Sequence, residues 1–86
     1  MTARRPVIAF AMSEGVRERV FPESVMRQYR AVADVAGFVT ELESDDARAV
    51  LAEGEVLITG WGAPRLGSAL LDAAPRLEAV LHAAGT

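Results

Sequence analysis

The stretch Gly60-Trp61-Gly62 contains residue types that suit the binding of a small ligand. Its tryptophan is the only one in the chain, and the indole offers a flat apolar wall with a single N–H donor. The two flanking glycines would let backbone amides approach a ligand closely. A structural role explains the same residues, with Trp61 packed under the next helix and both glycines in turns, so the stretch leaves two interpretations open.

A second small-residue stretch, Ala84-Gly85, follows His82-Ala83 near the end of the sequence. Backbone amides at Ala84 and Gly85 could face a carboxylate or a phosphate, because the small side chains leave them accessible. His82 is the only histidine and there is no cysteine, so companions for a metal site are missing. The sequence identifies no partner for His82 as a catalytic base, and we predict a packing role for it inside a strand.

Other polar residues beside hydrophobic segments do not form a cofactor motif. Glu41 and Glu43 follow a strand-like segment, as the ribose-binding acid of a dinucleotide fold does, but that fold requires G-x-G-x-x-G after its first strand. The sequence there is AMSEGVRE, in which Ser13 is better explained as a helix cap. A phospho-receiver needs acids directly after the first strand and an aspartate after the third, where this chain has Ser13 and Gly60.

The elements that would position these residues alternate along the chain. Hydrophobic runs predict strands, and apolar residues at helical spacing predict helices between them. This β-α-β-α-β-α-β order predicts parallel pairing through right-handed crossovers and an α/β, flavodoxin-like sheet of order 2-1-3-4, whose ligands lie outside the carboxyl ends of the strands. We expect strands at Pro6–Met12, Phe38–Leu42, Val56–Thr59 and Ala79–Ala83, and helices at 22–36 (with Gly37 as its stop), 44–54 and 65–74, with a further helical turn from Ser13 to Val20.

Composition favours one small globular domain. The chain has 86 residues, of which 51% are hydrophobic and 24% charged, with a net charge of −3. Its basic residues are dispersed, so nucleic acid is not an expected partner. No stretch approaches the ~20 apolar residues of a membrane span, and the short apolar run near the N-terminus is not a signal peptide. We therefore expect a cytoplasmic protein with no membrane partner.

The second half of the chain resembles a known enzyme family. The segments VLITGWGAPRL and LLDAAPRLEAVLHAAGT, which together cover about Val56 to Thr86, resemble the N-terminal segment of the D-isomer-specific 2-hydroxyacid dehydrogenases. The resemblance is carried by the phrase Ala74-Pro75-Arg76-Leu77 and by its spacing from the loop Ala84-Gly85-Thr86. The first half of the chain matches this family in pattern only.

This resemblance implies a role in an oxidoreductase. Members of the family have a flavodoxin-like substrate-binding domain that is interrupted by a Rossmann domain for NAD or NADP, and residues 1–86 would be a single, incomplete substrate-binding domain without the dinucleotide-binding domain. By matching, Trp61 and Gly62 would border the substrate cleft, and the amides of Ala84 and Gly85 would contact the carboxylate of a 2-hydroxy or 2-keto acid. The family's catalytic arginine, acid and histidine have no counterpart here, so we expect no bound cofactor and no activity from this chain alone.

Two alternatives to this interpretation remain. The chain could be a stand-alone, receiver-like α/β binding or interaction module, which would have to fold autonomously. It could also be a lobe that needs a partner chain to complete its sheet and cleft. If the last strand lies at an edge, its apolar residues Val80 and Leu81 lack a covering helix, and we expect self-association through that strand.

Overall fold

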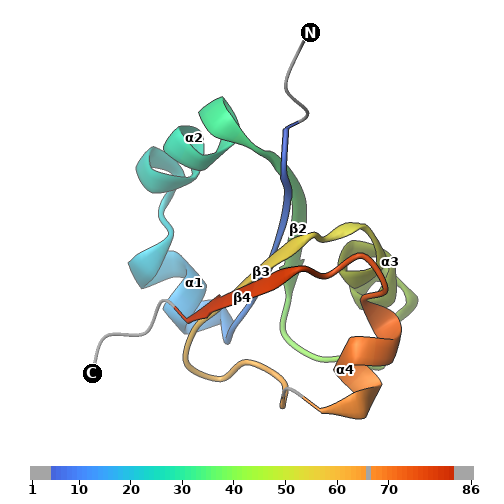
Figure 1. Cartoon of the computed structure of the whole chain (residues 1–86). Coiled ribbons are helices and arrows are strands. Elements are labelled where there is room, and N and C mark those ends of the chain that lie inside the picture. Colours follow the sequence, from blue (N-terminus) through green and yellow to red (C-terminus); the bar gives the residue numbers. More distant parts are fainter. Residues whose placement is uncertain (1–4, 66, 83–86) are drawn as a thin grey trace, which may run out of the picture.

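The computed structural model describes residues 5–65 and 67–82, which form four strands and four helices (Figure 1). All four strands are parallel and lie in one sheet of order β2-β1-β3-β4, which confirms the predicted α/β, flavodoxin-like topology. In chain order the elements are β1 (Val7–Ala11), α1 (Glu14–Val20), α2 (Glu23–Val32), β2 (Asp34–Val39), α3 (Asp45–Glu53), β3 (Val56–Thr59), α4 (Ser68–Ala73) and β4 (Ala79–His82).

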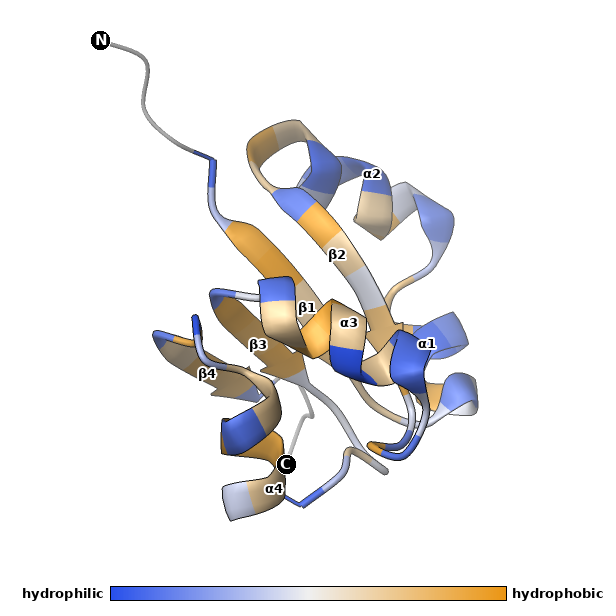
Figure 2. Cartoon of the chain, turned by 90° about the vertical axis from the view of Figure 1, so that its right-hand side faces the viewer, coloured by the Kyte–Doolittle hydropathy of each residue, from blue (hydrophilic) through white to orange (hydrophobic). Residues whose placement is uncertain are grey.

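Helices cover the sheet on both faces, with α1 and α2 on one side and α3 and α4 on the other (Figure 1). Alternate residues of the strands therefore belong to different cores, since successive side chains of a strand point to opposite faces. The strands carry the most hydrophobic segments, whereas the helices mix hydrophobic and hydrophilic residues (Figure 2). This pattern is typical of a parallel sheet that is buried between two helical layers.

The core under α1 and α2 is built around Phe10, whose side chain is fully buried. Its ring centroid lies 4.6 Å from that of Phe38, 5.0 Å from that of Phe21 and 5.4 Å from that of Tyr29. The opposite core is aliphatic: the strands contribute Ala9, Ala11, Val39 and Leu57, and the helices contribute residues such as Leu51 and Leu70. One face of the sheet is thus filled largely by aromatic rings and the other by aliphatic side chains.

The second strand begins earlier than the sequence predicted. Helix α2 ends at Val32 instead of continuing to Ala36, and β2 spans Asp34–Val39 rather than Phe38–Leu42. Gly37 is therefore not a helix stop: it lies within β2 at a φ of +147°, beside a shift in register where Ala9 pairs with Gly37. Pairing with β1 outweighs the weak strand propensity of this alanine- and glycine-containing segment.

Smaller differences concern the other element boundaries. Helix α4 begins at Ser68 rather than near Arg65, and Gly67 is its N-cap. Strands β1 and β3 lie where the hydrophobic runs predicted them, and β3 matches Val56–Thr59. The described part of the last strand, Ala79–His82, agrees with the prediction, whereas Ala83 lies outside the described residues.

Strand β4 lies at one edge of the described sheet and is poorly covered. It pairs with β3 alone, and all four of its residues are exposed. The exposed fraction is 39% for Val80 and 57% for Leu81. Among the described residues, no helix has the length and apolar character that are needed to cross a membrane.

Candidate functional site

A cavity of about 280 Å³ lies at the carboxyl ends of β3 and β4. This is the side of a parallel α/β sheet at which ligands bind. The cavity is enclosed by the last residue of β3, the loop that follows it, and the last described residue of β4. Its lining consists of Thr59, Gly60, Trp61, Gly62, Ala63, Pro64 and His82.

Trp61 forms a wall of this cavity and does not pack beneath a helix. Its exposed fraction is 63%, so the structure contradicts the packing interpretation of this side chain. The apolar faces of Ala63 and Pro64 lie in the same lining. Together these residues offer an apolar surface next to the polar ends of the strands, which is the usual composition of a small-molecule site.

Gly62 has the turn-forming role that the sequence analysis left open for the glycines of this loop. Gly62 has a φ of +82°, which L-residues with side chains rarely adopt. A Cβ added to it would lie 2.7 Å from the Cβ of Ser13. The amide of Ser13 donates a hydrogen bond of 2.9 Å to the carbonyl of Trp61. This bond connects the loop after β3 to the end of β1.

The same loop has two backbone donors for which the described part of the chain offers no acceptor. The Gly60 amide donates to the carbonyl of Ala11 at 3.0 Å, and the Ala63 amide donates to the carbonyl of Gly60 at 3.2 Å. The amides of Trp61 and Gly62 have no hydrogen-bond acceptor among the described residues. Because both residues line the cavity, these amides are candidate donors to an anionic group.

His82 has a polar partner that the sequence did not reveal. Its Nδ1 lies 2.8 Å from Oγ1 of Thr59, because Thr59 and His82 are directly paired residues of the adjacent strands β3 and β4. His82 lies within β4, as predicted, but it is exposed, so the predicted packing role is wrong. This contact depends on the register between β3 (VLIT) and β4 (AVLH), which the sequence alone does not determine.

The arrangement suits the recognition of an anion with an apolar body. Donors are available from the backbone of the loop and from the imidazole of His82, while Trp61 supplies an apolar wall. Among the described residues of the lining, His82 alone has a titratable side chain. Nowhere in the described parts of the chain do three His, Asp or Glu side chains gather in a way that could hold a metal ion.

Two of the remaining predicted residues, Ala84 and Gly85, lie outside the described residues. The others are not among the described lining of this cavity. Ser13 caps α1, because its Oγ accepts from the Val16 amide at 3.4 Å. Glu41 belongs to the approach to α3, where its Oε1 accepts from the Ser44 amide at 3.1 Å and from the Ser44 hydroxyl at 3.0 Å.

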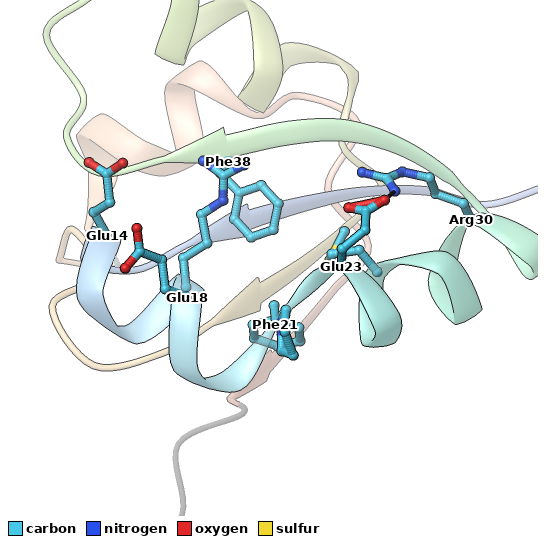
Figure 3. Close-up of a pocket in the computed structure, with 9 residues that line it drawn as sticks. Glu14, Glu18, Phe21, Glu23, Arg30 and Phe38 are labelled. Atoms are coloured by element: carbon cyan, nitrogen blue, oxygen red, sulfur yellow. Dashed lines mark hydrogen bonds and ion pairs between the residues drawn. The ribbon is translucent and has the colours of Figure 1, made fainter.

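A larger cavity of about 360 Å³ lies between α1, α2 and β2 (Figure 3). Its rings and charges are largely engaged with one another: the Arg17 guanidinium lies 4.1 Å from the centroid of the Phe38 ring, and Arg30 pairs with Glu23 at 2.5 Å. Glu14 and Glu18 complete one side of it (Figure 3). This mixture of paired, solvent-exposed charges favours a solvated surface over a specific site, and we assign the candidate site to the cavity beside Trp61.

Comparisons of this chain with models of protein families, with curated proteins and with solved structures found no match.

Proposed function

We propose that this chain forms the N-terminal part of the substrate-binding domain of an NAD- or NADP-dependent 2-hydroxyacid dehydrogenase, and that the cavity beside Trp61 binds the 2-hydroxy or 2-keto acid. The observation that carries the proposal is the composition and place of this cavity. It lies at the carboxyl ends of β3 and β4 and combines an exposed indole with the amides of Trp61 and Gly62, which have no acceptor among the described residues. The resemblance of residues 56–86 to that family supports the same position for the substrate.

The chemistry of a 2-keto acid fits these groups. Its carboxylate requires hydrogen-bond donors, which the amides of Trp61 and Gly62 supply. Its side chain is usually apolar, and Trp61, Ala63 and Pro64 offer an apolar surface. By the resemblance, the amides of Ala84 and Gly85 would add further contacts to the carboxylate.

The nicotinamide cofactor would be held by another part of the enzyme. A dinucleotide site needs converging glycine amides at the first turn of a helix. After β1 this chain has Glu14 in the first turn of α1 and a single glycine, Gly15, and a carboxylate there would repel a pyrophosphate. The residues present thus do not fit the cofactor, and hydride transfer is proposed only for an enzyme that includes a separate nicotinamide-binding domain.

Two experiments test this proposal. The reading frame downstream of codon 86 should encode a strand followed by G-x-G-x-x-G, and the product of the longer frame should oxidise NADH or NADPH in the presence of a 2-keto acid. The 86-residue chain should show no such turnover. A downstream frame without the fingerprint, or turnover by the 86-residue chain alone, would refute the proposal and favour a stand-alone module.

A further inference from the structure

We propose that His82 is a substrate-binding residue that donates a hydrogen bond from Nε2 to the carboxylate of the bound acid, and that Thr59 is the positioning residue that orients its ring. Because His82 lines the cavity assigned above to the acid, its role rests on that proposed function. Neither residue is among those to which the family resemblance assigns a role.

The contact between the two residues fixes one ring nitrogen and leaves the other available. Oγ1 of Thr59 lies 2.8 Å from Nδ1 of His82. Thr59 is buried, with an exposed fraction of 4%, and this is the only hydrogen bond of its hydroxyl in the described structure. Nε2 has no hydrogen-bond partner among the described residues, and His82 is part of the cavity lining.

The hydrogen-bonding chemistry of imidazole makes Nε2 a donor in two protonation states. When the Thr59 hydroxyl donates to Nδ1 of the neutral ring, the ring hydrogen lies on Nε2. When the ring is protonated, Nδ1 donates to Oγ1 of Thr59 and Nε2 again carries a hydrogen. An anionic ligand stabilises both arrangements, and it stabilises the protonated ring more strongly because the hydrogen bond is then charge-assisted.

The described residues that line the cavity together with His82 supply no competing charge. Strand β3 and the loop behind it, residues 56–64, contain no acidic or basic residue. No other described residue of the cavity lining has a titratable side chain. A carboxylate bound in the cavity would lie beside the imidazole, and a protonated ring would hold it more strongly than a neutral one.

The test is the affinity of the 86-residue chain for pyruvate, measured through the fluorescence of its single tryptophan. Pyruvamide, which has no carboxylate, is the matched control ligand. We expect pyruvate to bind about tenfold more tightly at a pH of about 5.5 than at about 8, because a protonated imidazole donates a charge-assisted hydrogen bond. Pyruvamide should bind with no such dependence.

Substitutions separate the roles of the two residues. His82→Gln keeps a neutral amide donor but cannot be protonated, so it should retain weak binding and lose the pH dependence. Thr59→Val removes the hydroxyl from a buried strand position and should weaken binding and flatten the pH profile, whereas Thr59→Ser should restore both. Circular dichroism establishes that each variant remains folded.

The outcomes distinguish this inference from the proposed function. Binding of pyruvate by His82→Gln with the wild-type affinity and pH profile would refute the role of His82 while leaving the proposed site intact. A Thr59→Val variant that behaves like the wild type would refute the positioning role of Thr59. Absence of pyruvate binding by the wild-type chain at both pH values would refute the proposed site and the role of His82 together.

Discussion

Gly62 lies so close to Ser13 that a Cβ on the glycine would be 2.7 Å from the Cβ of the serine. The amide of Ser13 also donates to the carbonyl of the neighbouring Trp61. The ends of β1 and β3 are therefore joined by this hydrogen bond, by a second one from the Gly60 amide to the carbonyl of Ala11, and by the close approach of Gly62 to Ser13. This junction holds the loop whose amides and indole form the candidate site.

Gly62→Ala should destabilise the protein. Its φ of +82° is unfavourable for alanine, and the added methyl group would collide with Ser13, so the free energy of unfolding should fall by about 1–3 kcal/mol. Gly15→Ala is the matched control, because a Cβ at Gly15 meets nothing within 4 Å and the residue lies in α1; it should raise stability by about 0.5–1 kcal/mol. Equal effects of the two variants in urea denaturation would contradict the assigned role of Gly62.

Phe10→Ala should be far more damaging than Phe10→Leu. The Phe10 ring is fully buried and contacts three other aromatic rings, so its removal leaves a cavity that costs about 3–5 kcal/mol. Leucine fills much of that space and should cost less. For a domain of this size, Phe10→Ala should lose the cooperative thermal transition, which circular dichroism at increasing temperature would detect.

Arg5 should contribute to stability by holding the end of α2. Its guanidinium donates to the carbonyls of Arg30 at 2.5 Å and Ala33 at 2.7 Å, and its Nε lies 3.1 Å from Oδ1 of Asp34. Cations at helix C-termini are favourable, and we expect Arg5→Ala to cost about 1 kcal/mol. Lysine keeps the charge but not the fork of donors, so Arg5→Lys should recover only part of the loss. A full recovery would show that charge alone is responsible.

Leu81→Lys should reduce self-association without lowering stability. Leu81 is exposed on the edge strand β4, and a lysine on an edge strand opposes pairing between sheets. In sedimentation equilibrium the wild-type chain should show a concentration-dependent increase in mass, and the variant should stay monomeric. A monomeric wild-type chain with a sharp, cooperative melt would instead favour the stand-alone module.

The strand order was predictable because hydrophobic runs alternate with helical patterns and short connections leave few topologies. The start of β2 was not predictable from the sequence, because Val32, Ala33 and Ala36 continue the helical spacing of α2. Only pairing with β1 brings Asp34–Val39 into the sheet. In the candidate site, Trp61 and Gly62 were identifiable from residue type. The contact of His82 with Thr59 was not, because it depends on the register between β3 and β4.

The most direct test of the proposed site is a nuclear magnetic resonance titration of the ¹⁵N-labelled chain with a 2-keto acid. We predict saturable shifts of the backbone amide signals of Trp61, Gly62 and His82, with no shift for Glu18 or Glu23 of the cavity between α1, α2 and β2. Shifts confined to that second cavity, or no saturable shift in the loop after β3, would contradict the assignment of the substrate site.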